Sequence, residues 1–149
     1  MAVPRQNRQK SEDRRSYNDR QGPTLDTGSI ALKTIKADLF DIVARMTAEI
    51  IADDTKSNKP TQLRRFYDEI VMWENKTSQQ SEKFDEYLPF IRMINAKAAY
   101  ARGRKLVDDN YVKLLNDCLK QVDSPETMRN FKLFMEAFMG FYKEKRPKD

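Results

Sequence analysis

The chain contains no histidine and only one cysteine among its 149 residues. Without histidine there is no Ser-His or Cys-His nucleophile pair, no histidine general base and no histidine-rich metal site. A single cysteine forms no internal disulfide, which is in keeping with a reducing cytoplasm. Any enzymatic chemistry in this chain would have to rest on carboxylates alone.

Glycine and proline are also scarce, at four and six residues, and the apolar residues recur at helical rather than alternating spacing. No apolar run is long enough to span a membrane, and no signal-peptide pattern opens the chain. We therefore expect a cytoplasmic, all-α protein: a single compact bundle of about five helices over residues 26–145. No membrane partner and no cofactor are expected.

The two ends of the chain differ from this body. Residues 1–25 hold six Lys or Arg, three acidic residues and few sizeable apolar side chains, which predicts a disordered, mildly basic tail. Residues 146–149 are expected to fray. The net charge is +5, but without the N-terminal tail 22 of the 28 basic and 20 of the 23 acidic residues remain, leaving +2. So small an excess suits RNA binding within an assembly better than tight binding alone.

The first two helices are expected on either side of a polar loop around residues 56–60. The first should begin between residues 26 and 29 and end near residues 53–54. Its seam is expected to be Leu32, Ile35, Leu39, Ile42, Val43, Met46 and Ile50. Thr61 should cap the second helix, which is expected to end before a polar loop over residues 76–80.

The central stretch, residues 84–106, combines an apolar helical seam with a basic remainder. It has no acidic residue between Tyr87 and Val107, and Pro89 and Gly103 predict a bend and a helix end. Its basic residues are Arg92, Lys97, Arg102, Arg104 and Lys105. Such a helix can pack on one side and hold an anion on the other, although cations at a helix C-terminus also complement the helix dipole.

The last two helices should supply much of the core. Asp108 or Asp109 is expected to cap one of them, with Cys118 pointing inward as a small core residue. Ser124 and Pro125 predict the start of the final helix, which runs to about residue 145. That helix is the most aromatic part of the chain, and its wide apolar arc suggests packing on another subunit.

Two acidic pairs, Asp53-Asp54 and Asp108-Asp109, allow a metal-site interpretation. A loop pair and a helix cap explain them better, because nothing nearby supplies further ligands at metal spacing. A carboxylate nuclease with a divalent metal would require both pairs to converge with further carboxylates. We therefore predict no metal site and no catalytic residue.

Arg64 and Arg65 have two interpretations. Asp68 and Glu69 lie four residues further along the same expected helix, so each arginine has an intrahelical partner available. The alternative is contact with RNA phosphates or bases. The residues of the second helix alone leave both possibilities open.

Three blocks of the sequence resemble a known family. They are TQLRRFYDEI (61–70), FDEYLPFIRMINAKAAYARGR (84–104) and FKLFMEAFMGFYK (131–143). In this order and at these separations they resemble the small helical subunit of type III-A CRISPR effector complexes, the Csm small subunit.

The resemblance implies an all-helical subunit with no known catalytic activity. Such subunits line up as a short filament of copies, beside backbone subunits that carry the crRNA, and contact the large signalling subunit at one end. They help to form the channel for the crRNA–target RNA duplex in antiviral defence. Carried over to this sequence, the implied RNA-binding residues are Arg64, Arg65, Arg92, Lys97, Arg102, Arg104 and Lys105. The alternative is a free-standing single-stranded RNA-binding or adaptor protein, which would bind RNA tightly by itself.

Overall fold

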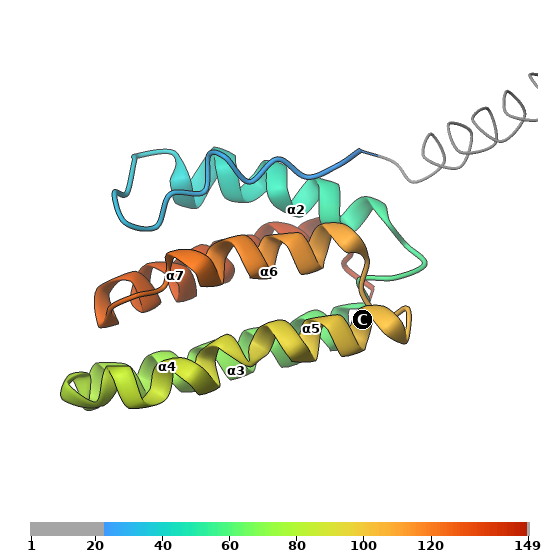
Figure 1. Ribbon diagram of the computed structural model, residues 1–149. Coiled ribbons are helices and arrows are strands. Elements are labelled where there is room, and N and C mark those ends of the chain that lie inside the picture. The colour runs from blue at the N-terminus through green and yellow to red at the C-terminus, as the bar shows by residue number, and fades with distance from the viewer. Residues whose placement is uncertain (1–22, 149) are drawn as a thin grey trace, which may run out of the picture.

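The computed structural model describes residues 23–148, and within this range the protein is built from helices joined by short connections (Figure 1). In chain order they are η1 (Leu39–Val43), α2 (Ala44–Asp53), α3 (Pro60–Gln79), η2 (Ser81–Lys83), α4 (Phe84–Arg92), α5 (Ile94–Gly103), α6 (Asp109–Gln121) and α7 (Pro125–Lys145). The predicted all-α fold is confirmed. Residues 1–22, most of the expected N-terminal tail, lie outside the described range.

The helices lie in three tiers (Figure 1). The α6 and α7 helices form the middle tier and α2 lies above them. The lower tier consists of α3 together with α4 and α5, which run back alongside it. The long α7 helix packs against both α2 and α3, whereas α5 packs mainly against α6. Both outer tiers therefore pack against helices of the middle tier.

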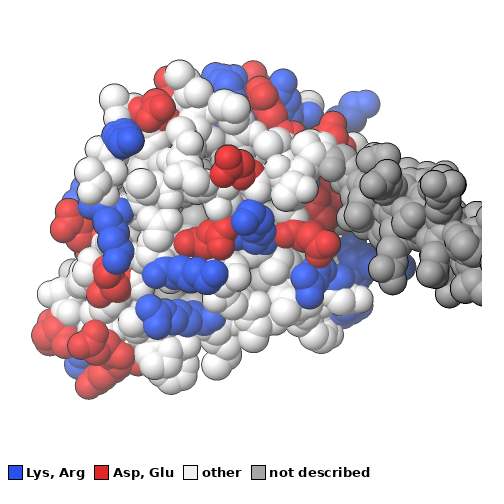
Figure 2. Space-filling view, turned by 45° about the horizontal axis from the view of Figure 1, so that its top comes forward, with Lys and Arg blue, Asp and Glu red and all other residues white. Residues whose placement is uncertain are grey.

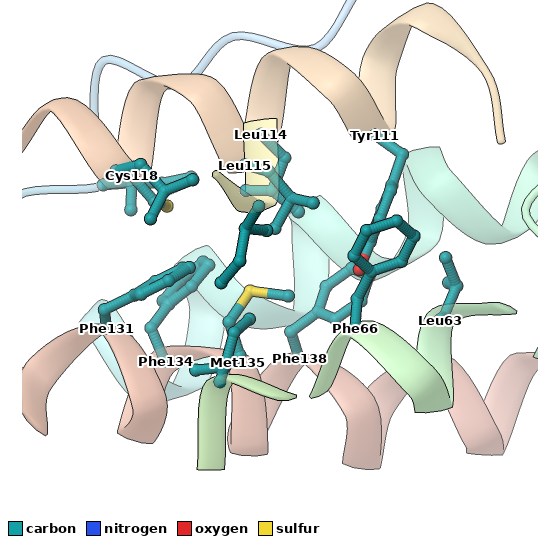
Figure 3. Packing of buried hydrophobic residues seen from close by; sticks show 14 of the residues in the cluster. Leu63, Phe66, Tyr111, Leu114, Leu115, Cys118, Phe131, Phe134, Met135 and Phe138 are labelled. Atoms are coloured by element: carbon teal, nitrogen blue, oxygen red, sulfur yellow. The ribbon is translucent and has the colours of Figure 1, made fainter. Parts of the chain in front are cut away.

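The core lies where α3, α6 and α7 face one another (Figure 3). Its central side chains are Leu63, Phe66, Tyr111, Leu114, Leu115, Cys118, Phe131, Phe134, Met135 and Phe138, all buried. The inward position of Cys118 is confirmed, and burial raises the pKa of its thiol. The α7 helix begins as predicted, with Ser124 accepting a hydrogen bond from the backbone N–H of Thr127.

The first helix begins about ten residues later than the sequence predicted. Residues 23–38, which we call the strap, form a non-helical segment that runs beside the bundle before η1 (Figure 1). Leu25, expected in the disordered tail, is buried in the strap, as are Ile30 and Leu32. Apolar spacing alone did not distinguish a strap with occasional buried residues from a helix with a continuous seam.

Side chains of α6 hold the strap in place. The Gln121 amide accepts from the Leu32 N–H at 2.8 Å and donates to the Ile30 carbonyl at 2.6 Å. Asn110 accepts from the Leu25 N–H at 2.9 Å, and the Thr27 hydroxyl donates to Asp117 at 2.6 Å. These side chains satisfy strap backbone groups that a helix would have paired internally, which explains why the helical prediction is wrong here.

The buried face of α2 is also not the predicted one. Its buried residues are Ala44, Thr47, Ala48, Ile51 and Ala52, and all except Ile51 have small side chains, which suits the close packing of α2 on α7. The predicted seam residues Ile35, Ile42 and Met46 are instead 45%, 55% and 58% exposed. The prediction favoured the larger apolar residues, whereas packing against a helix as bulky as α7 selects the smaller ones.

Three boundaries in the lower tier differ from the predicted ones. Lys59, not Thr61, occupies the N-cap position of α3, without a side-chain capping bond, and α3 continues to Gln79 through most of the loop expected at 76–80. Buried Thr77 stabilises this last turn, since its hydroxyl donates to the Glu74 carbonyl at 3.2 Å. Pro89 lies inside α4, and the break to α5 falls at Met93. The proline removes only the bond to a carbonyl in the first, exposed turn of α4, so the helix continues for another turn.

Asn58 connects three parts of the bundle at one end. It is fully buried with φ of 53°, and its amide donates to the Ile51 carbonyl at 3.0 Å. Its side-chain oxygen accepts from the Asp108 N–H at 2.9 Å, which ties the α2–α3 loop to the start of α6. Its carbonyl accepts from the Tyr142 hydroxyl and, at 3.1 Å, from Arg146. The end of α7 is thus held against the same loop.

Within residues 23–148, no helix combines the length and apolar character that a membrane span needs.

Candidate nucleic-acid interface

A groove between α3 and α5 brings together three of the predicted RNA-binding residues. Its volume is about 440 Å³, and its lining is Gln62, Arg65, Phe66, Glu69, Lys97, Tyr100, Ala101, Arg104 and Leu106. Phe66, Ala101 and Leu106 make its apolar wall, and Arg65, Lys97 and Arg104 supply its cations. Residues from two helices and the turn after α5 therefore form one partly apolar, cationic surface.

The side-chain ammonium group of Lys97 lies 2.6 Å from Glu69 Oε1, so an ion pair joins α5 to α3. From the helical spacing, Glu69 was the expected intrahelical ion-pair partner of Arg65. In the structure that intrahelical pair is replaced by the contact to Lys97. Arg65 consequently has no ion pair with any residue in the range 23–148, and its charge is available in the groove.

Arg104 is held beside an exposed aromatic ring. Its guanidinium carbon lies 5.8 Å from the centroid of the Tyr100 ring, and its Nη1 donates to the Tyr100 hydroxyl at 3.4 Å. Tyr100 is 66% exposed, so this pair stands at the surface rather than in the core. The contact is a cation–π arrangement with the ring accessible to solvent.

The other predicted residues do not line the groove. Arg64 pairs with Asp68 at 3.1 Å, as the helical spacing allowed, and Arg102 pairs with Asp109 at 3.3 Å. Arg92 donates to the Val122 carbonyl at the end of α6, at 3.4 Å. These three contacts lie on other sides of α3, α4 and α5.

Lys105 has a backbone role instead of a place in the groove. Its φ is 61°, and the N–H groups of Lys105 and Leu106 donate to the carbonyls of Arg102 and Ala101, both at 2.9 Å. This is the Schellman arrangement that ends a helix, with lysine at the left-handed position where glycine is usual. The predicted end of α5 at Gly103 is confirmed, although the left-handed residue comes two positions later.

The acidic pairs come together only in part. Asp54 accepts from the Ser57 hydroxyl at 2.6 Å, and Asp108 caps α6 by accepting from the Tyr111 N–H at 2.9 Å. Burial raises the pKa of Asp108, and the neighbouring Asp54 charge raises it further. The pKa of Asp54, which burial alone would raise, is lowered by hydrogen bonds, first of all from Ser57. Within the described part of the chain, no cluster of three or more His, Cys, Asp or Glu residues could hold a metal.

Tyr100, Gln62 and the Lys97–Glu69 link were not anticipated from the sequence. A signal for Tyr100 was present, because it is an aromatic residue off the apolar seam, three residues after Lys97 and four before Arg104. This spacing places all three on one side of a helix. The Glu69 link had no such signal, since its partner lies on another helix.

Comparison with known protein families identifies the chain. The family model described as Csm2 Type III-A matches residues 34–148, which include all seven predicted RNA-binding residues. The chain belongs to this family. It is therefore a small subunit of a type III-A CRISPR-Cas complex, and its partners include other Csm subunits. Csm2 Type III-A proteins are structural small subunits. Neither a curated protein nor a solved structure matches this Csm2 chain.

Proposed function

We propose that this Csm2 chain is a non-catalytic RNA-binding subunit whose α3–α5 groove lines the channel for the crRNA–target RNA duplex in antiviral interference. The observation that carries the proposal is the convergence of Arg65, Lys97 and Arg104 in one groove. The remaining predicted residues, Arg64, Arg92, Arg102 and Lys105, contribute at most peripheral contacts.

The chemistry of the groove suits an RNA backbone. Arginine offers a planar fork to phosphate oxygens and lysine a compact point charge, and neither reads a base sequence through such contacts. In an RNA-guided complex, base pairing supplies sequence specificity, so the protein needs to recognise only backbone and shape. On the face shown in Figure 2, Lys and Arg are interspersed with Asp and Glu. Because this face has no broad positive field, binding of an RNA phosphate would depend on a local cluster of cations such as the α3–α5 groove.

The same chain is proposed to assemble with copies of itself. Two sets of apolar side chains are exposed: Ile42 in η1 and Met46 in α2, at 55% and 58%, and Phe90 in α4 and Met93 directly after it, at 53% and 50%. The α2 and α4 helices belong to different tiers (Figure 1). Joining one set to the other in the next copy gives a head-to-tail contact, which propagates as a filament.

Charge reversal tests the RNA-binding part of the proposal. Complexes reconstituted with Arg65→Glu, Lys97→Glu and Arg104→Glu combined should bind target RNA at least about tenfold more weakly, because repulsion replaces attraction at several phosphates. The matched control reverses three exposed lysines elsewhere, Lys56, Lys83 and Lys120. Equal binding by the groove variant and the control would refute the groove as the interface.

Mixing variants tests self-assembly. Met46→Glu blocks one apolar set and Met93→Glu the other, so each variant alone should fail to form filaments. An equimolar mixture should give dimers through the one intact pair of surfaces, measured by analytical ultracentrifugation. A head-to-tail contact through these two sets is ruled out if both variants assemble as the unmodified chain does.

Gentle purification of the tagged protein from its host separates the two function hypotheses. Recovery with other Csm subunits and short RNAs of uniform ends supports the proposal. Recovery alone, or with heterogeneous cellular RNA bound tightly, would favour the free-standing RNA-binding protein.

A further inference from the structure

Tyr100 exposes an aromatic ring within a cationic groove, where a core role does not explain it. At 66% it has the largest exposed fraction among the large hydrophobic side chains that are exposed in residues 23–148. It extends from α5 and is exposed, whereas Ile94, Ala98 and Ala101 of the same helix are buried. Phosphate binding alone does not require an aromatic ring at this position.

The surroundings of the ring provide what a stacked nucleobase needs. Arg104 lies 5.8 Å from the ring centroid and 3.4 Å from its hydroxyl, which keeps a guanidinium plane next to the aromatic surface. Arg65 lines the same groove without an ion-pair partner in the described range, and Lys97 stands one helical turn before Tyr100. Aromatic rings bind bases by stacking, while adjacent cations bind the flanking phosphates.

The rest of the lining is consistent with a flat, partly apolar ligand. Phe66, Ala101 and Leu106 form an apolar wall, and the groove volume of about 440 Å³ falls within the range of small-molecule pockets. Glu69 neutralises Lys97, so the charge that remains for an incoming anion comes mainly from Arg65 and Arg104. A ligand with an aromatic ring and one or two phosphates matches this arrangement.

We propose that Tyr100 stacks on an unpaired nucleobase of an RNA strand held in the α3–α5 groove, with Arg104 beside it and Arg65 on the adjacent phosphate. This inference rests on the proposed RNA-binding function and adds a base contact to it. Every nucleobase has an aromatic face, so the contact tolerates any sequence. It fixes the position of a displaced or terminal base without discriminating between bases.

The test measures target-RNA affinity of the reconstituted complex over a series of salt concentrations. Tyr100→Ala should weaken binding by roughly tenfold, because one stacking contact is lost, while the slope of log affinity against log salt stays unchanged. Tyr100→Phe keeps the ring and should bind as the unmodified complex does. Arg65→Gln removes a phosphate contact and should reduce the slope by about 0.7.

RNA with single abasic sites then locates the strand that supplies the base. An abasic nucleotide at the stacked position, placed in the target or in the guide, should weaken the unmodified complex and have no further effect on the Tyr100→Ala complex. This non-additivity is the signature of a direct contact.

The possible failures are distinguishable. If Arg65→Gln, Lys97→Gln and Arg104→Gln weaken binding but Tyr100→Ala does not, the stacking inference is wrong and the proposed function stands. If none of these variants changes binding, the proposed function fails as well. Loss of binding in Tyr100→Phe equal to that in Tyr100→Ala would also overturn stacking, since it would assign the effect to the hydroxyl.

Discussion

Lys97 on α5 and Glu69 on α3 form an ion pair of 2.6 Å across the groove that we assign to RNA. The lysine is 52% exposed and the glutamate 21%, so the pair is only partly shielded from water. Such a contact stabilises the fold by about 0–1 kcal/mol. Its larger consequence is electrostatic, because Glu69 offsets one of the three cations in the groove and leaves Arg65 without its helical partner.

Removing the Glu69 charge should strengthen RNA binding. In Glu69→Gln the groove has one negative charge fewer and Lys97 becomes available to a phosphate, so the complex should bind RNA several-fold more tightly. The salt slope should become steeper by about 0.7. Asp68→Asn is the matched control, because it removes the same charge from α3 but releases Arg64, which lies outside the groove. Identical affinities for the two variants would contradict the assignment.

Lys105→Gly should stabilise the protein and leave RNA binding unchanged. Lysine at φ of 61° carries a steric cost that glycine avoids, so the free energy of unfolding should rise by up to about 1 kcal/mol. Denaturant titration measures the stability and a filter-binding assay the affinity. A clear loss of RNA affinity would show that the Lys105 side chain is part of the interface after all.

Gln121→Ala should release the strap from α6. Two hydrogen bonds are lost, to the Leu32 N–H and the Ile30 carbonyl, at a cost of roughly 1–2 kcal/mol. Hydrogen exchange at Leu32 should become faster, while exchange in α7 should change little. Asn116→Ala serves as control, since Asn116 is on the same helix and makes no side-chain hydrogen bond within residues 23–148. Unchanged exchange at Leu32 in the Gln121 variant would show that the strap is held by its buried apolar residues instead.

As the pH rises, the free energy of unfolding of Asp108→Asn should increase relative to that of the unmodified chain. The folded-state pKa of Asp108 is raised by burial and by Asp54, above its ordinary value of 3.8. A raised pKa means that the folded state binds the Asp108 proton more strongly than the unfolded state does. The protonated Asp108 therefore adds to the free energy of unfolding, and this addition is complete below a pH of about 3.8. It is lost as the pH rises through the folded-state pKa. Asparagine does not ionise and still caps α6.

The measurement for Asp108 is the difference in unfolding free energy between the variant and the unmodified protein at pH 4 and pH 7. The difference should shift in favour of Asp108→Asn at the higher pH. Asp109→Asn, one position away, is the control for a general effect of removing a negative charge. A pH-independent difference would disprove the unfavourable ionisation of Asp108.

The sequence predicted those features that depend on local spacing. The inward position of Cys118 and the capping of α7 by Ser124 follow from helical periodicity and capping chemistry, and both are confirmed. The strap was missed because its stability comes from side chains about 90 positions away, such as Gln121. The α2 face was missed because α7 selects small residues there. Neither cause can be read from a local window.

The candidate site shows the same division. The basic stretch on α5 was visible in the sequence, and so was the Arg64–Asp68 pair. Which cations share a groove was not, because that depends on how α5 lies against α3. Helical spacing assigned Glu69 to Arg65, whereas the fold pairs it with Lys97. Glu69 could pair with Arg65 on its own helix or with a cation on another helix, and the tertiary structure determines which pair forms.

Ultraviolet crosslinking of target RNA and guide RNA to the assembled type III-A complex, followed by mass spectrometry of this subunit, tests the central claim most directly. Trypsin cleaves after Lys97 and Arg102, so a crosslinked base at Tyr100 would appear on the peptide of residues 98–102. The account predicts that this peptide is the main RNA adduct of the subunit and that its yield falls in the Arg65→Glu, Arg104→Glu double variant, which keeps both tryptic sites. Adducts confined to α2, α7 or the strap, with the α5 peptide unmodified, would contradict an RNA interface in the α3–α5 groove.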